Sequence, residues 1–181
     1  ARLDDHLGSY SVEPLQSRAG LLADRLALSG LNAICAMLRA GLAEREPHPQ
    51  LWRATMALLA ALEANPDWPP EYLRWELLLL EEMGFGLDHG RCAVTGARDD
   101  LAYVSPRTGR AVSRGGAGDW ADRLFALPQC LLGQGTASPD ELRQGLAITG
   151  HFLTRELGPL LNGRPLPEAR ARLILLLEKS R

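Results

Sequence analysis

The chain has 181 residues, 46% of them hydrophobic and 23% charged, and a formal net charge of −2. These values fit a soluble globular domain with subsidiary parts, and they exclude a protein whose whole surface is built to grip phosphates. A membrane-spanning helix is excluded as well, because the longest apolar run, residues 77–80, is far shorter than the ~20 residues that a span needs.

The N-terminal part is predicted to be helical after a short extended segment. Leu7 to Val12 alternates weakly between apolar and polar residues, which favours a strand. From Leu15 to about Ala43 apolar residues recur every three or four positions, which predicts a long helix that Gly30 kinks or divides. Pro47 ends this helix because proline has no N–H for the helical ladder.

Two further helices are predicted before the middle of the chain. The first spans about residues 51–63, and the second begins near Pro70 and stops at Gly84. Apolar residues cover almost the whole circumference of the second helix, which predicts that it is buried on most sides and lies at the centre of the fold. At ~1.5 Å per residue it is about 20 Å long, enough to cross a small domain.

The segment from Gly84 to Gly118 contains few apolar residues. Its turn residues and short alternating runs predict a small knuckle closed by a β-hairpin, inserted between two helical blocks at about residues 86–118. We expect this insert to be ordered by the packing of its apolar residues, Val94, Leu101, Tyr103, Val104, Val112 and Trp120.

The C-terminal part is again predicted to be helical. Ser138 caps a helix and Glu141 closes a capping box with it. A last helix starts at Pro167 or Glu168 and ends near Lys179. The predicted fold class is therefore mainly α: a helical bundle with a small, zinc-knuckle-like β-hairpin insert that lacks metal ligands.

Two ordered sets of residues carry a resemblance to a known family. The first set is Arg74 to Leu80, Met83 to Gly86, Cys92 and Gly96, and the second is Leu157-Gly158, Arg164-Pro165-Leu166 and Arg170. The first set resembles the RecO family of bacterial recombination mediators, in which a helix of Arg, aromatic, Glu and Leu residues ends in Leu-Gly-aromatic before the first knuckle cysteine. The second set resembles that family's C-terminal element, and residues 15–47 resemble its long helical hairpin. The resemblance covers roughly residues 10–178.

The resemblance implies a division of the chain into four parts. Members of the family begin with an OB-fold that binds DNA, whereas this chain starts at Ala1 without a Met. Residues 1–13 are expected to be a remnant of that OB-fold, its last strand, with the rest absent. Residues 14–85 and 134–181 are expected to form two parts of a helical domain, and residues 86–133 a degenerate knuckle and hairpin insert.

The resemblance also implies a function. It predicts a non-enzymatic mediator of DNA repair and homologous recombination that acts with RecR and RecA in the bacterial cytoplasm, at the nucleoid. Such a protein displaces single-strand DNA-binding protein and anneals single strands, and it contacts single- and double-stranded DNA mainly through the OB-fold. We expect no cofactor and no membrane partner. This chain is expected to supply mainly protein contacts, with RecR and with the acidic, Phe-ended tail of single-strand DNA-binding protein.

The knuckle departs from the family in its metal ligands. Many members carry two Cys-x-x-Cys pairs, a strong pattern for four-thiolate zinc. Here Thr95 replaces the partner of Cys92, and the second pair falls within residues 112–116, which contain no cysteine. One thiolate does not hold structural zinc, so we predict no metal.

The remaining cysteines and one histidine are interpreted as structural. Cys35 and Cys130 are expected to be small core residues, and His151 a core or half-buried one. Three cysteines in dissimilar contexts argue against a disulfide framework and favour a reducing compartment.

Arginines around the insert and near the C-terminus are the candidate partner- or DNA-binding residues. One interpretation is a solvated face balanced by nearby carboxylates. The other is contact with phosphates or with an acidic peptide, whose terminal carboxylate needs basic side chains beside an apolar pocket. Pairing with Glu71 or Glu76 is a further interpretation for Arg74. The candidates are Arg74, Arg107, Arg110, Arg164, Arg170 and Arg172.

Other functions find less support in the residues. A thiol hydrolase would need an orienting group beside Cys92 and His89, and the segment offers none. Residues 115–118 lack the Lys-Ser/Thr and the strand–helix context of a phosphate loop. The alternative function is a helical adaptor that binds protein and no nucleic acid, which would show no salt-dependent DNA binding.

Overall fold

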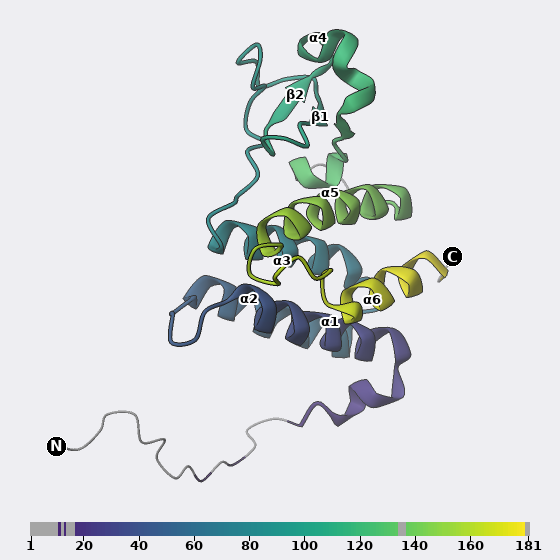
Figure 1. Cartoon of the computed structure of the whole chain (residues 1–181). Coiled ribbons are helices and arrows are strands. Elements are labelled where there is room, and N and C mark those ends of the chain that lie inside the picture. The colour runs from purple at the N-terminus through teal and green to yellow at the C-terminus, as the bar shows by residue number, and fades with distance from the viewer. Residues whose placement is uncertain (1–10, 12, 14–16, 134–136, 180–181) are drawn as a thin grey trace, which may run out of the picture.

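The structure is a computed structural model, and it describes residues 11, 13, 17–133 and 137–179. Within this part the chain is mainly helical, with one small sheet (Figure 1). The elements in chain order are η1 (Ala19–Ala23), α1 (Arg25–Gly41), α2 (Pro49–Ala64), α3 (Pro69–Glu82), β1 (Leu101–Val104), β2 (Ala111–Ser113), α4 (Arg114–Ala117), η2 (Gly118–Arg123), β3 (Phe125–Ala126), η3 (Gln129–Leu132), α5 (Pro139–Leu157) and α6 (Glu168–Lys179).

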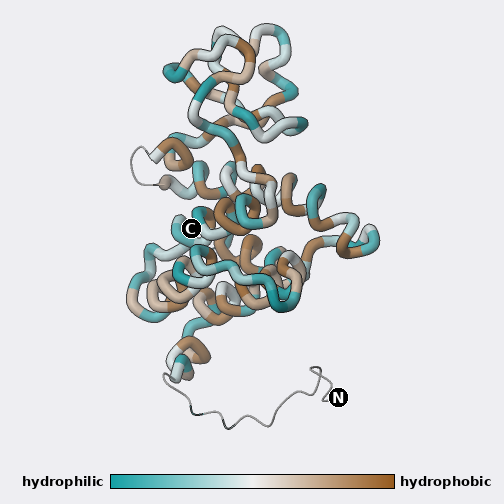
Figure 2. Tube along the Cα trace, turned by 90° about the vertical axis from the view of Figure 1, so that its left-hand side faces the viewer, coloured by the Kyte–Doolittle hydropathy of each residue, from teal (hydrophilic) through white to brown (hydrophobic). Residues whose placement is uncertain are grey.

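The long helices pack into one bundle, and the insert stands beyond α5 at one end of the molecule (Figure 1). Helix α1 packs against α2 and α6, α2 packs against α3, and α3 packs against α5. Hydrophobic segments recur along these helices, while hydrophilic segments gather at the outer turns (Figure 2). None of the helices in the described ranges is long and apolar enough to cross a membrane.

Helix α3 lies at the centre of the bundle, as its all-round apolar sequence predicts. Tyr72, Trp75 and Leu79 are each at most 2% exposed. The Tyr72 and Trp75 rings stack with their centroids 5.8 Å apart, and the Trp75 Nε1–H donates to Thr55 Oγ1 of α2 at 2.8 Å. Gly84 follows the helix with a φ of +87°, a left-handed conformation that suits glycine and ends the helix.

A buried ion pair joins α3, α5 and α6. The Glu76 carboxylate is fully buried and accepts from Arg170 at 2.6 and 2.9 Å and from the Thr149 hydroxyl at 2.6 Å. Arg170 also donates to the Leu146 carbonyl at 2.9 Å. Burial lowers the pKa of Arg170, but the Glu76 carboxylate more than offsets this, so the pKa is raised and the side chain stays charged. The pair therefore fixes how the three helices meet.

Glycines allow two of these helix contacts to be close. A Cβ on Gly145 of α5 would lie 2.4 Å from Leu73 of α3, and one on Gly150 would lie 2.9 Å from the Arg170 guanidinium. The missing side chains therefore let α3 approach α5 and let Arg170 cross over α5 to reach Glu76.

The insert is built around a three-stranded antiparallel sheet in the order β2-β1-β3. In β1, Tyr103 pairs with Val112 of β2 and Ala126 of β3, and Val104 pairs with Ala111 of β2 and Phe125 of β3. Leu101, Val104, Ala111 and Val112 are buried and supply its small core.

The predicted fold class is confirmed: the described residues form a helical bundle with a small antiparallel sheet in the insert. The capping box at Ser138 and Glu141 is present, and its hydrogen bonds hold the pKa of Glu141 below its usual value. The division into parts at residues 14, 86 and 134 stays a prediction. Of the expected strand in residues 1–13, only residues 11 and 13 are described, so the rest of it lies outside the described residues.

Two details of the sequence prediction are wrong. Helix α1 begins only at Arg25, because Asp24 caps it by accepting from the amides of Leu26 and Ala27 at 2.8 and 3.0 Å. It runs through Gly30 without a break. A Cβ at Gly30 would lie 2.8 Å from the Trp68 ring, so this glycine serves close packing and does not divide the helix.

The second error concerns the core of the insert. Val94 and Trp120 are 67% and 62% exposed, so they do not pack inside it. The Trp120 ring is covered on one face by the Arg123 guanidinium, 4.8 Å from its centroid. The sheet also extends beyond the predicted hairpin, because β3 adds a third strand after residue 118.

Breaking the buried ion pair is expected to destabilise the fold strongly. Replacing Arg170 by Ala leaves the Glu76 carboxylate buried without its cation, which lowers the free energy of unfolding by about 3–5 kcal/mol. Urea unfolding followed by tryptophan fluorescence measures this change.

The matched control is Arg172→Ala, two residues further along α6. Arg172 is exposed and pairs with Glu168 one helical turn away, so its loss changes the free energy of unfolding by no more than about 0.5 kcal/mol. Equal effects of the two substitutions would contradict the role given to the buried pair.

Candidate functional site

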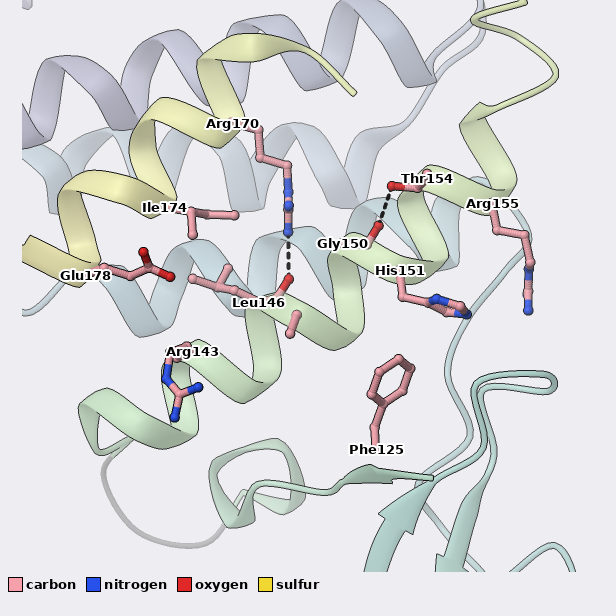
Figure 3. Close-up of a pocket in the computed structure, with 11 residues that line it drawn as sticks. Phe125, Arg143, Leu146, Gly150, His151, Thr154, Arg155, Arg170, Ile174 and Glu178 are labelled. Atoms are coloured by element: carbon pink, nitrogen blue, oxygen red, sulfur yellow. Dashed lines mark hydrogen bonds between the residues drawn. The ribbon is translucent and has the colours of Figure 1, made fainter. Parts of the chain in front are cut away.

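A groove on the outer side of α5 combines an apolar floor with basic side chains, and we call it the α5–α6 groove. It has a volume of about 660 Å³ and is formed by α5, α6 and β3 (Figure 3). Its lining residues are Phe125, Arg143, Leu146, Ala147, Gly150, His151, Thr154, Arg155, Arg170, Ile174 and Glu178.

One end of the α5–α6 groove is closed by the contact between the insert and α5. The Phe125 ring from β3 meets the His151 ring edge to face, with centroids 5.1 Å apart (Figure 3). His151 Nε2 lies 3.0 Å from the Pro106 carbonyl oxygen in the turn between β1 and β2. This contact holds Phe125 against the groove as an apolar wall.

The three arginines of the groove differ in how firmly other groups of the protein hold their guanidinium groups. Arg155 lies over the Phe152 ring and donates to the carbonyl oxygens of Pro106 and Arg107 at 3.2 and 2.9 Å. Arg170 is held by Glu76, as described above. Arg143 at the opposite end is half exposed, and among the described residues its side chain forms an ion pair with Asp140, a long one of 3.4 Å. Arg143 is therefore the cation that a ligand can recruit most easily.

This arrangement suits binding of a ligand that is apolar at one end and anionic at the other. Leu146, Ala147 and Ile174 offer apolar contacts, and Arg143 offers charge-assisted hydrogen bonds to a carboxylate. No lining residue is a serine or cysteine nucleophile beside a base, so the groove gives no sign of nucleophilic catalysis.

The structure does not gather the six predicted arginines in one place. Arg170 lies in the floor of the α5–α6 groove. Arg107 is near this groove because its backbone carbonyl accepts from Arg155, which is one of the lining residues. Arg74 is exposed on α3 and pairs with Glu71, one of the two partners expected for it. Arg110 pairs with Asp88 at 3.4 Å in the insert.

The last two candidates lie elsewhere. Arg164 is exposed after α5 and donates to the Leu161 carbonyl at 3.2 Å. Arg172 lines a different groove, between α1 and α6, together with Arg25 and Lys179. A common binding surface made of all six arginines therefore does not exist, and the role of each in binding stays a prediction.

Two residues interpreted as buried are exposed. His151 is exposed on α5, where it contacts the insert, and Cys35 is exposed on α1. Helix α1 buries Ala33, Ile34 and Met37, so Cys35 falls just outside its buried face. Cys130 is partly buried against the core.

Sequence reasoning missed most of the α5–α6 groove. Arg143, Ala147, Gly150 and Thr154 are spaced by three or four residues, so they share one face of α5. This stripe of small and polar residues, beside the apolar stripe that faces α3, is the signal that would have found the groove floor.

The insert contains a second candidate site, centred on the buried sulfur of Cys92. Ser113 donates to this sulfur from its backbone N–H at 3.2 Å and from its hydroxyl at 3.4 Å, and the amides of Val94 and Thr95 donate at 3.4 Å. A Cβ on Gly116 would lie 2.9 Å from the same sulfur. Residues 92, 95, 113 and 116 thus converge, and they stand in two pairs with the Cys-x-x-Cys spacing.

The donor set at this point does not fit zinc. Structural zinc sites take four thiolate or imidazole ligands, whereas these four positions offer one thiol, two hydroxyls and no side chain at Gly116. Within residues 17–133 and 137–179 no group of three or more His, Cys, Asp and Glu side chains is placed to hold a metal ion. Hydrogen bonds to sulfur take the place that metal bonds would occupy.

These hydrogen bonds favour the ionised form of Cys92. Burial alone would raise the pKa of the thiol, but the hydrogen bonds from Ser113 and Thr95 outweigh it and lower the pKa to about 6. At neutral pH the insert therefore encloses a thiolate that accepts several hydrogen bonds.

Comparison with known proteins identifies close relatives of this chain. Residues 22–165 match the family model described as the C-terminal region of recombination protein O. A DNA repair protein RecO of Cereibacter sphaeroides is 72% identical over 180 residues, which are 99% of this chain and 75% of that protein. The proteins of the same name from a Ruegeria species and from Paracoccus denitrificans are 54% and 52% identical, over 96% and 100% of this chain and 73% and 74% of those proteins.

The low pKa of Cys92 predicts that the free energy of unfolding depends on pH. The folded pKa of about 6 lies below that of an unfolded cysteine near 8.5, so the thiolate stabilises the fold fully above the unfolded value and loses this effect as pH falls through 6. The free energy of unfolding of the native chain should therefore rise, relative to Cys92→Ser, between pH 6 and pH 9.

Urea unfolding of both proteins across this pH range measures the difference. Cys35→Ser is the control for the loss of a thiol, because Cys35 is exposed on α1 and lies outside the insert. A constant difference for Cys92→Ser would show that the thiol stays protonated.

Proposed function

Because the chain belongs to the RecO family and shares that family's role in DNA repair and recombination, we propose that its helical bundle captures the acidic tail of single-strand DNA-binding protein in the α5–α6 groove. The family resemblance supplies the partner: an acidic peptide that ends in phenylalanine. The chemistry of the groove, an apolar floor beside basic side chains, supports this choice of site.

The observation that carries this proposal is the pairing of an apolar floor with a recruitable cation. The terminal phenylalanine would lie on Leu146 and Ile174, against the wall formed by Phe125. The terminal carboxylate and the acidic residues before it would meet Arg143 and Arg155. A short peptide bound this way gains specificity from its end group, since only a chain terminus carries both the ring and the carboxylate.

The proposed mechanism is exchange through tethering. A strand coated with single-strand DNA-binding protein displays many tails, and capture of one tail holds the coated strand at a high effective concentration near the mediator. Annealing of complementary strands and loading of RecA with RecR would then follow as in the family, with DNA held mainly by an OB-fold. This mechanism needs binding and no catalytic step.

The alternative, a helical adaptor with no role on nucleic acid, is not favoured. The relatives that match nearly the whole chain are named DNA repair proteins. We propose that the partners of this chain are RecR, RecA and single-strand DNA-binding protein.

The test is binding of a fluorescein-labelled peptide that ends in Asp-Asp-Ile-Pro-Phe, followed by fluorescence anisotropy. We expect binding that is lost when the final phenylalanine is removed. Arg143→Glu should raise the dissociation constant at least about tenfold, because it replaces the recruitable cation by a repelling anion.

The matched control is Arg172→Glu, which makes the same charge change on the α1–α6 side of the bundle. It should leave the dissociation constant unchanged within about twofold. The reverse pattern would move the peptide to the groove lined by Arg25, Arg172 and Lys179. Absence of binding to the native chain would overturn the proposal altogether.

A further inference from the structure

A second groove lies where α1, α3 and α5 end, and we call it the helix-end groove. It opens at the end of the bundle where the chain leaves α3 for the insert, on the left of Figure 1. It has a volume of about 600 Å³. Its lining residues are Ala40, Gly41, Leu42, Ala43, Glu46, His48, Glu82, Met83, Phe85, Glu156, Pro159 and Leu160.

The helix-end groove exposes large apolar side chains. Phe85 is 41% exposed and Leu160 is 64% exposed, and Leu42 and Met83 line the groove while packing partly buried against the core. Gly41 lets the floor pack closely, since a Cβ there would lie 3.2 Å from the Met83 sulfur. Covering apolar groups of this size with a partner lowers the free energy, because it removes apolar surface from water.

The backbone holds Phe85 in place. Its N–H donates to the Leu80 carbonyl at 2.8 Å, and the Gly84 N–H donates to the Glu81 carbonyl at 2.9 Å. These bonds form the closing turn of α3, so the ring is presented from a fixed position. Because this part of the site is already ordered, it loses less entropy when a partner binds.

The charge of the helix-end groove is negative. Its rim carries three carboxylates, those of Glu46, Glu82 and Glu156, and no lysine or arginine is among its lining residues. His48 Nδ1 lies 2.8 Å from Glu82, and Glu156 contacts the side chain of Arg155, whose guanidinium turns toward the insert.

Helix ends add to this negative potential. The C-termini of α1, α3 and α5 all meet at this groove, and the last carbonyls of α3, those of Leu79, Leu80 and Glu81, accept hydrogen bonds from the turn that closes the helix. The helix dipole places roughly half a negative charge at each such end. Side chains and backbone therefore favour the same kind of ligand, a cation.

We propose that the helix-end groove docks a basic, apolar segment of a protein partner. Leucine or phenylalanine side chains of that segment would cover Phe85 and Leu160, and its lysines or arginines would meet Glu46, Glu82 and the helix ends. This site is separate from the α5–α6 groove and selects the opposite charge. An acidic tail is repelled here, so the two grooves serve different partners.

The experiment uses the full chain and two synthetic probes. One is a fluorescein-labelled amphipathic peptide with leucine on one face and lysine on the other, and the second has glutamate in place of every lysine. Fluorescence anisotropy at low and at physiological salt should show binding of the lysine peptide only, weakened by salt.

Two double variants locate the site. Glu46→Gln with Glu82→Gln removes two charges of the groove, while Glu44→Gln with Glu81→Gln removes two exposed charges on the same segments outside it. Both variants change the net charge equally. We expect the first to raise the dissociation constant of the lysine peptide at least about tenfold and the second to change it less than about twofold. Equal binding by the two variants overturns the proposal.

A third variant tests the apolar part without touching the His48–Glu82 contact. Phe85→Ser with Leu160→Ser changes exposed side chains, so the fold is expected to survive, and the lysine peptide should bind at least about fivefold more weakly. Binding that is unchanged would overturn the apolar contact. A dimer that this variant dissociates, together with no binding of the lysine peptide, would assign the groove to a second copy of the chain and overturn the proposal. Tail-peptide binding in the α5–α6 groove should be unaffected by all three variants, so the two proposals fail independently.

Discussion

The ion pair between Glu76 and Arg170 holds α3 and α6 in one fixed arrangement. A carboxylate and a guanidinium leave water only if each finds its partner in good geometry, and here the partners come from α3 and α6, 94 residues apart in sequence. Thr149 and the Leu146 carbonyl complete the set from α5. Three helices must therefore be in place together, and the floor of the α5–α6 groove is a direct result of where they meet.

The bundle separates charge, whereas the formal net charge of the whole chain is only −2. Three arginines and one carboxylate, that of Glu178, line the α5–α6 groove, whereas three carboxylates and three helix C-termini gather at the helix-end groove. As proposed, one face takes an acidic peptide and another a basic one. Under these two proposals, grooves of opposite charge would let the chain hold two different protein partners at once. The overall acidity of the sequence conceals this division because it averages over both.

Local patterns in the sequence predicted the elements well and their assembly poorly. The apolar circumference of α3 and the Ser138–Glu141 capping box are properties of neighbouring residues, so they could be read directly. The α5–α6 groove could not, because β3, α5 and α6 come together only through tertiary packing. The sequence makes Arg170 a candidate binding residue, because no local pattern shows that its guanidinium is paired with Glu76. Cys35 lies one position from the buried Ile34, and periodicity does not resolve a rotation of that size.

The insert lies inside the loop that the contact between Glu76 and Thr149 closes, 73 residues apart. The entropy of closing such a loop grows only with the logarithm of its length, by about 0.6 kcal/mol for each doubling. The bundle is therefore nearly indifferent to the length of what it encloses, and residues can be added or removed at the tip of the insert with little effect on equilibrium stability. Folding speed responds differently, because contacts between distant residues must form before α3, α5 and α6 can stabilise one another. An enclosed segment of this kind can change its length and its ligands over evolution while the bundle keeps its shape. Such changes affect the folding rate of the chain more than its equilibrium stability.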